Sequence, residues 1–458
     1  MRRFTLAVAL VSLALAAGGC STVKRINPFH GPKGPSEVAG DGQRISIVAD
    51  DEKVEVAEGL KGADFFLPEP TALADWPLPG GTLSQSVAHV DAGHSLSVAW
   101  RRGFGEASKR GKEITAPPVM AAGKVFVMDG EATVSAINAS NGEVVWRKDL
   151  RPSNKRDREA FGGGLAFADG KLYVTSGYRF AARLDANSGA VEWKKATDEP
   201  IHAAPTVASG VVMAVSIDNT LLTFNAETGD PGWNYQALSE PARILAASSP
   251  AVSGDTVVAS FGSGELVALR VANGIDLWSE TLSRANRSNA LSEIRDIPGR
   301  PVIYEGDVFA VSHSGVFAVT DLRTGSTRWT LPIAGITSPW VAGDVVYVVS
   351  RDGKVYCVAR ESGQVYWIKD LNAGLPVTKK RAFGLFGKKV VRPVWSSPLL
   401  ASNRLIIGSS AGQLVALNPK TGEIEKSENI GAPVLIGPIA AGGMIYIATD
   451  KAQLVALK

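Results

Sequence analysis

Five histidines and two cysteines are the residues best suited to hold a metal or attack a substrate in this chain of 458 residues. The histidines stand at positions 30, 89, 94, 202 and 313, and their separations do not match those of metal-ligand sets. The chain contains no P-loop and no GxGxxG fingerprint. Aspartates and glutamates fall mostly in turn sequences, where they cap the backbone. We therefore expect no catalytic residue, no metal and no cofactor.

Cys20 is the one residue whose chemistry a sequence signal supports. It follows residues 1–19, in which Arg2 and Arg3 precede a short apolar run and a set of small residues. That pattern is typical of a signal peptide, and the position of the cysteine resembles a bacterial lipobox, which implies acylation of Cys20 after cleavage. Because Ser21 follows rather than an aspartate, the resemblance favours the outer membrane. The alternative is an ordinary signal peptide with an incidental cysteine.

The composition of the remaining chain excludes several classes of protein. The formal charge is +3, and the leader contains two arginines and no acid, which leaves +1. This balance is too small for a nucleic-acid-binding surface. Only Cys357 remains beyond the leader, so no disulfide framework is expected, and its apolar run predicts a buried side chain. Residues 20–91 are rich in Gly, Pro and charge, which predicts a lipidated linker, docked in part on the surface of a domain spanning 92–458.

One stretch of sequence is repeated throughout that domain. The copies at 116–150 and 337–371 share a small-Pro-apolar opening, a turn, two apolar runs and a small-Gly turn followed by tryptophan. Each copy holds four runs of strand length, and units of this size with four strands are typical of β-propeller blades. One tryptophan per blade favours a packing role between neighbouring sheets. The tryptophans that end successive units are Trp146, Trp193, Trp233, Trp278, Trp329 and Trp367.

The two ends of the repeat array predict how the ring closes. A seventh copy carries Lys426 where tryptophan is expected, and an eighth stops at Lys458 before its fourth strand. Residues 95–100 have the pattern of a fourth strand ending in Trp100, without the other three. Pairing these two ends would complete the last blade and remove both exposed sheet edges. We therefore expect an all-β fold, an eight-bladed β-propeller of four-stranded antiparallel blades closed by an N-terminal strand.

The connections between blades are the candidate binding regions. In an up-and-down blade they share one face with the second-to-third turns, while the tight glycine turns lie on the other face. Long insertions on one face of a repeat protein usually mark the binding face. One of them is strongly basic, and its alternative interpretation is a solvated hairpin with no partner. The long connections are 101–114, 151–162, 239–247, 282–298 and 372–394.

The repeats resemble the PQQ-like family, whose blades end in a glycine followed by a tryptophan, as in residues 321–329. That family includes quinoprotein dehydrogenases, which bind pyrroloquinoline quinone and calcium and cover the quinone with a disulfide of adjacent cysteines. This chain has no adjacent cysteines and is shorter. A quinoprotein dehydrogenase is therefore one alternative, and a periplasmic sensor propeller with a small ligand in its central channel is another.

Lipobox, linker, N-terminal strand and eight repeats together resemble the BamB family of the outer-membrane β-barrel assembly (BAM) machinery. The resemblance implies a non-catalytic, lipid-anchored scaffold on the periplasmic face of the outer membrane that assists folding and insertion of β-barrel proteins. It implies outer-membrane lipid, the periplasmic repeats of BamA and unfolded β-barrel clients as partners. By the same resemblance, two connections contact BamA through Arg243, Ile244, Leu245, Arg295, Asp296 and Ile297.

Overall fold

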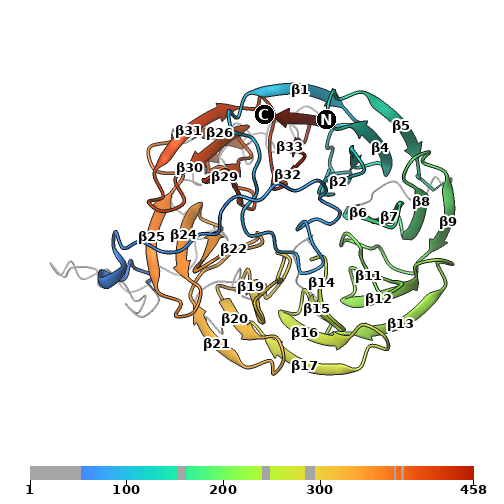
Figure 1. Ribbon diagram of the computed structural model, residues 1–458, viewed down its shortest axis with the longest axis horizontal. Coiled ribbons are helices and arrows are strands. Elements are labelled where there is room, and N and C mark those ends of the chain that lie inside the picture. Colours follow the sequence, from blue (N-terminus) through green and yellow to red (C-terminus); the bar gives the residue numbers. More distant parts are fainter. Residues whose placement is uncertain (1–52, 153–160, 240–247, 284–293, 376–377, 383–385) are drawn as a thin grey trace, which may run out of the picture. The chain divides into compact units, whose positions relative to one another are not determined.

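The computed structural model describes residues 53–152, 161–239, 248–283, 294–375, 378–382 and 386–458. Within the unit Lys53–Lys458, eight four-stranded antiparallel sheets form the blades of a closed ring (Figure 1). The first strand of each blade lies innermost and the fourth lies at the rim. The predicted all-β, eight-bladed propeller is confirmed.

Blades 1 to 7 each take four strands that are consecutive in the chain, apart from an extra hairpin between blades 6 and 7. Blades 1 to 3 contain β2 (Val119–Ala121), β3 (Lys124–Met128), β4 (Thr133–Asn138), β5 (Val144–Asp149), β6 (Gly163–Ala168), β7 (Lys171–Ser176), β8 (Phe180–Asp185), β9 (Val191–Ala196), β10 (Thr206–Ala208), β11 (Val211–Val215), β12 (Thr220–Asn225) and β13 (Pro231–Gln236). Blades 4 to 6 contain β14 (Ala251–Ser253), β15 (Thr256–Ser260), β16 (Glu265–Arg270), β17 (Asp276–Thr281), β18 (Val302–Tyr304), β19 (Asp307–Val311), β20 (Phe317–Asp321), β21 (Thr327–Leu331), β22 (Trp340–Ala342), β23 (Val345–Val349), β24 (Lys354–Ala359) and β25 (Val365–Asp370). The hairpin is β26 (Thr378–Ala382) with β27 (Phe386–Val391), and blade 7 contains β28 (Leu399–Ala401), β29 (Arg404–Gly408), β30 (Gln413–Leu417) and β31 (Ile424–Asn429).

Blade 8 is built from both ends of the described chain. Strands β32 (Ile439–Ala441), β33 (Met444–Ala448) and β34 (Gln453–Leu457) are completed by β1 (Val98–Gly103), which pairs antiparallel with β34. The amide of Ser95 donates to Lys458 O at 3.0 Å, and the amide of Lys458 donates to Ser97 O at 2.9 Å. Closure by the N-terminal strand, predicted from the two incomplete units, is confirmed.

Burial explains why the inner strands of each blade are apolar throughout, while the outer strand alternates between two kinds of residue. The second and third strands are buried on both faces because neighbouring blades cover them; β3 and β19 are examples. The fourth strands, such as β5 and β31, alternate between exposed and half-buried residues at the rim. Cys357 lies on a third strand and is fully buried as a free thiol, as expected.

Tryptophans join seven of the eight pairs of neighbouring blades in the same way. Each indole Nε1 donates to a backbone carbonyl of the following blade at 2.7–3.2 Å. The indole ring also covers the glycine of that blade's third-to-fourth turn, where a Cβ would lie 2.5–2.9 Å from ring atoms. These glycines have φ between +70° and +73°, which side chains rarely adopt. The pairs are Trp100–Gly142, Trp146–Gly189, Trp193–Gly229, Trp233–Gly274, Trp278–Gly325, Trp329–Gly363 and Trp367–Gly422.

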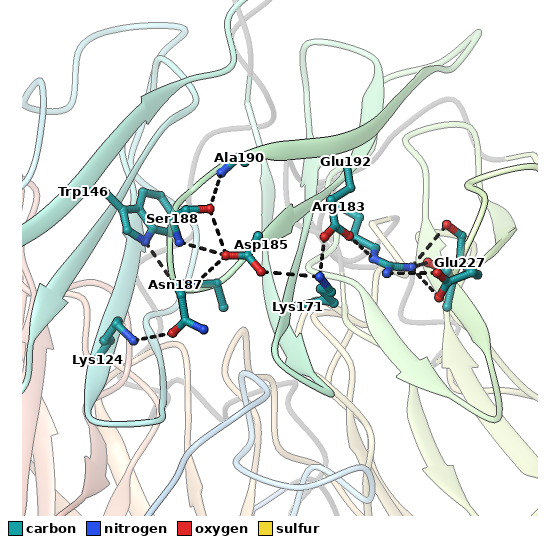
Figure 2. Close-up of polar contacts among 12 residues, drawn as sticks. Lys124, Trp146, Lys171, Arg183, Asp185, Asn187, Ser188, Ala190, Glu192 and Glu227 are labelled. Atoms are coloured by element: carbon teal, nitrogen blue, oxygen red, sulfur yellow. Dashed lines mark hydrogen bonds and ion pairs between the residues drawn. The ribbon is translucent and has the colours of Figure 1, made fainter.

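Figure 2 shows the polar contacts around one such turn, in blade 2. Asp185 accepts from the amides of Asn187 at 3.1 Å and Ser188 at 2.9 Å, and these contacts, with the Ser188 hydroxyl, lower the pKa of Asp185. Lys124 of blade 1 donates to the Asn187 amide oxygen at 2.9 Å, so the turn is held from the neighbouring blade. On the other side Arg183 forms an ion pair with Glu227 of blade 3 at 2.8 Å. These contacts within the ring therefore hold the turn that packs against the tryptophan, and no binding partner is needed to order it.

Candidate functional site

The predicted partner-binding residues fall into two connections on the same face of the ring. Arg243, Ile244 and Leu245 lie outside the described residues, and the prediction for them stays untested. In the second connection the carbonyl of Asp296 accepts from the amide of His313 at 2.8 Å, in the second-to-third turn of blade 5. The amide of Ile297 donates to Phe261 O at 3.3 Å, beside the corresponding turn of blade 4. Residues 295–297 are thus held between two turns of the face that carries the long connections.

Within this segment the three side chains differ in exposure. Arg295 is exposed, whereas Asp296 is 3% and Ile297 2% exposed. The Asp296 carboxylate lies against Gly262, 2.6 Å from the position that a Cβ there would take. Asp296 and Ile297 therefore hold the connection in place, and Arg295 is the side chain that it presents to solvent.

The opposite face, which carries the tight turns, is crossed at its centre by residues 71–93, the segment drawn in blue across the ring in Figure 1. This segment hydrogen-bonds through its backbone to the inner strands of six blades or to the turns that follow them. Trp76 is 1% exposed and pairs with Met120 in both directions, at 2.6 and 2.8 Å. The side-chain nitrogen of Gln85 donates to Pro250 O at 3.0 Å. Further contacts are Phe167 N to Pro77 O, Val252 N to Leu83 O, Ile303 N to Ser84 O, Val90 N to Leu400 O and Gly442 N to Leu73 O.

His89 fastens the end of this segment to blade 7. Its Nδ1 lies 2.6 Å from Pro68 O, and its Nε2 accepts from the amide of Asn403 at 2.9 Å. Because Nε2 accepts a hydrogen bond, the imidazole is neutral with the proton on Nδ1. Burial lowers the pKa of His89, which favours this neutral form.

The predicted linker, residues 20–91, is described from residue 53 onward, and this part already contacts the ring near its start. Val54 and Val56 pack against a hydrophobic cluster of blades 5 and 6, and the amide of Ala57 donates to Val365 O at 2.9 Å.

A cavity of about 540 Å³ occupies the centre of the ring on the inner side of this segment. Trp76 and Pro79 form its floor, and its walls come from the residues that precede the inner strand of all eight blades. Its charged residues are Glu113, Arg300 and Asp450, and none of the three was predicted from the sequence as a site residue. A proline precedes the inner strand in every blade except blade 2, and this repeated signal marks where the wall of the channel begins in each repeat.

The described part of the chain forms neither a metal site nor a membrane-spanning helix. There, no group of three or more His, Cys, Asp or Glu side chains is placed to hold a metal ion. None of the helices in these same residues is long and apolar enough to cross a bilayer. Cys20 lies outside the described residues, so its acylation remains a prediction.

The chain is similar to proteins of one functional class over most of its length. The profile of a family described as "Outer membrane protein assembly factor BamB" matches residues 84–157, 130–369 and 385–458. A relative with that same description, from Moranella endobia (strain PCIT), is 23% identical over 339 residues, which cover 73% of this chain and 82% of the relative.

Two solved structures share the fold at lower identity. BamB from Moraxella catarrhalis superposes with a TM-score of 0.65 at 17% identity, covering 79% of this chain and 99% of that one. A europium-containing methanol dehydrogenase superposes with a TM-score of 0.66 at 13% identity, covering 82% and 89%. At these identities the superpositions show the propeller alone, because a propeller hosts both binding proteins and enzymes.

Proposed function

Because this chain belongs to the family of the outer membrane protein assembly factor BamB, we propose that it is a non-catalytic scaffold of the β-barrel assembly machinery. In this proposal it binds the periplasmic repeats of BamA and assists the folding and insertion of β-barrel proteins. The observation that carries the proposal is the family match, which covers residues 84–157, 130–369 and 385–458 and therefore the propeller. The fold is compatible with a scaffold, since each repeat is accounted for by strand pairing and blade packing.

The proposed contact surface is the face with the long connections, around Arg295 and residues 243–245. Arg295 is exposed, and the buried side chains of Asp296 and Ile297, which directly follow it, hold its backbone in place. Arginine beside apolar residues is a common arrangement at the centre of protein interfaces. The opposite face supports the choice indirectly, because residues 71–93 already cover its centre.

Arg295→Glu tests the placement of this surface. We expect the reversed charge to weaken binding to purified BamA periplasmic repeats about tenfold or more, about 1.4 kcal/mol. The matched control is Arg323→Glu, an exposed arginine in a tight turn of blade 5 on the other face. Leu245→Ala tests the other connection in the same assay. Equal losses from Arg295→Glu and Arg323→Glu would show that the surface is wrongly placed.

Asp296 is unsuited to this experiment, although the sequence named it among the contact residues. Its side chain is buried against Gly262, so removing it changes the packing of the connection itself. A loss of binding could then come either from a lost contact with BamA or from the changed packing of the connection. Arg295→Glu avoids this problem because the side chain is exposed and the backbone contacts of its neighbours remain.

Anchoring through an acylated Cys20 is the second part of the proposal. Stable attachment to a bilayer requires more than one acyl chain, since each buried CH₂ contributes about 0.8 kcal/mol. Cys20→Ala is expected to move the protein from the membrane fraction to the soluble periplasmic fraction. If the variant stays with membranes after washing at high salt, the lipid anchor is not what holds it there.

A further inference from the structure

The central cavity combines a closed floor with a charged wall, and neither feature is used by the proposed partner surface. Residues 71–93 close the channel on one face, where the buried residues Trp76 and Pro79 line the cavity. The volume of about 540 Å³ lies within the range of small-molecule sites. A channel that is blind at one end and wide enough for a ligand is a pocket rather than a pore.

Arg300 is the cationic side chain that lines this pocket, and no carboxylate among the described residues forms an ion pair with it. It directly precedes the inner strand of blade 5, and its amide donates to the Ser338 hydroxyl at 2.8 Å. Its side-chain Nε is buried, and no atom among the described residues accepts a hydrogen bond from it. Burial alone lowers the pKa of Arg300 to about 10, with no carboxylate compensating. Arg300 is half-buried as a whole, but leaving its buried Nε without a hydrogen-bond acceptor costs free energy, and an anion bound in the pocket would offset that cost.

Two carboxylates line the same cavity from the other side of the ring. Glu113 precedes β2 of blade 1, and Asp450 follows β33 of blade 8, across the ring from the blade 5 strands in Figure 1. Asp450 accepts from the Ser108 hydroxyl at 3.0 Å. Burial raises the pKa of Asp450, and the nearby charge of Glu113 adds to this effect. A positive group placed between Glu113 and Asp450 would relieve their repulsion.

Apolar side chains line the same cavity as the cation and the two acids. Trp340 stacks on Trp76 with a centroid distance of 6.3 Å and an interplanar angle of 19°, and both line the cavity. Ile336, Leu435 and Ile436 extend this apolar lining. A ligand complementary to all three groups has a negative end for Arg300, an apolar middle, and a positive end for Glu113 and Asp450.

We propose that the cavity binds a short apolar peptide with free termini, its carboxylate on Arg300 and its ammonium group facing Glu113 and Asp450. The apolar side chains of the peptide then contact Trp340 and the neighbouring aliphatic residues. This site is separate from the BamA surface proposed above, so the two proposals can fail independently. Binding involves no covalent step.

The test uses the detergent-solubilised full-length protein and the tripeptide Leu-Phe-Leu in isothermal titration calorimetry. We expect the free tripeptide to bind, its C-terminal amide to bind at least tenfold more weakly, and its N-acetyl form to bind more weakly than the free peptide. Arg300→Gln should lose binding at least tenfold, while Arg323→Gln, on the other face, should bind as the parent does.

Several outcomes would overturn the proposal. No binding of the free tripeptide, or equal binding of the amide, would exclude recognition of a carboxylate by Arg300. Equal binding of the N-acetyl form would exclude recognition of the ammonium group. Tighter binding of pyrroloquinoline quinone with calcium would assign the pocket to a different ligand class. The amide comparison uses unaltered protein, so it decides the matter even if Arg300→Gln does not fold.

Discussion

Seven junctions between blades are held by a tryptophan and a turn glycine, whereas the eighth, between blades 7 and 8, uses a lysine. Lys426 occupies the register position of the tryptophans, opposite Ala416 and beside the same bulge. Its Nζ donates to Ser95 O at 2.8 Å and lies 3.0 Å from Glu428. In blade 8 the fourth strand is β1, which comes from the N-terminal side of the chain, so no third-to-fourth turn connects it to β34. An indole there would have no turn glycine to cover.

The comparison separates two ways of holding a ring together. The seven continuous junctions rest on apolar contact and one hydrogen bond that the repeat supplies each time. The closing region instead depends on strand pairing between β1 and β34 and on residues 71–93, which bridge distant blades. Closure is therefore a property of the N-terminal segment rather than of the repeat.

The largest effect is expected from removing that segment. A chain that begins at Ser95 loses the buried Trp76 and Val90 but keeps β1. A chain that begins at Phe104 loses these two residues and β1 as well. We expect the first to lose more than about 5 kcal/mol of unfolding free energy, since burial of one large side chain alone contributes about 3–5 kcal/mol. The second should aggregate, because the edge of β34 is exposed.

Thermal unfolding and light scattering on the two truncated proteins check this prediction. A chain beginning at Phe104 that stays monomeric and melts with the parent would mean that the N-terminal strand does not close the ring. If only that chain is affected, closure depends on β1 and the segment crossing the tight-turn face contributes little.

Breaking one repeat junction should have the next largest effect. Trp193 is 9% exposed and lies on Gly229, with Nε1 donating to Ala226 O at 3.2 Å. Trp193→Ala should lower the free energy of unfolding by about 3–5 kcal/mol. Trp193→Phe keeps an aromatic ring and loses the hydrogen bond, so it should lose less. A loss below about 1 kcal/mol for Trp193→Ala in urea unfolding would contradict the role given to this contact.

The sequence could predict the ring because its signals are local and repeated. Each blade has its own apolar runs, turn glycine and tryptophan, and the incomplete units at the two ends indicate the closing pair, including the strand with Trp100. The contacts of Gln85 with Pro250 and of His89 with Asn403 could not be predicted, because this part of the chain has no periodicity and its partners are distant.

The site was predicted less completely than the fold for the same reason. Residues 295–297 were identified as one contact segment, yet the turns of blades 4 and 5 decide that Arg295 is exposed and Asp296 is buried. Arg300 stands five residues away and is indistinguishable in sequence from a surface arginine. Its position at the channel follows only from where the inner strand of blade 5 begins.

A change in pH should act on the N-terminal segment and leave the tryptophan junctions unaffected. The folded pKa of His89 lies below its usual value of 6.5 because of burial, so the unfolded chain binds a proton first as the pH falls. The stability that neutral His89 contributes is therefore fully present above pH 6.5, the usual pKa of histidine in the unfolded chain. It declines as the pH falls from 6.5 to the folded pKa. Below the folded pKa it no longer changes with pH.

Melting curves of the parent and of His89→Gln between pH 8 and pH 5 isolate this contribution. We expect the variant to be less stable at pH 8 by about 1 kcal/mol, the contribution of a typical hydrogen bond, and the gap to narrow at pH 5. The pKa of His313 is also lowered by burial, but His313 is present in both proteins and cancels in the difference. A gap that stays constant across this range would show that His89 does not titrate as its contacts predict.

The smallest effect is expected at the exceptional junction itself. Lys426 is 38% exposed at its side chain and makes one hydrogen bond and one surface ion pair, and exposed pairs of this kind contribute little. Lys426→Ala should therefore change the free energy of unfolding by less than about 1 kcal/mol, against about 3–5 kcal/mol for Trp193→Ala. Lys426→Trp restores the repeat sequence but not the missing turn, so it should not stabilise the ring. Urea unfolding of Lys426→Ala, Lys426→Trp and Trp193→Ala under the same conditions tests this prediction. If Lys426→Trp gains as much unfolding free energy as Trp193→Ala loses, blade 8 offers an acceptor for the indole. In that case the absence of a third-to-fourth turn in blade 8 does not explain the lysine.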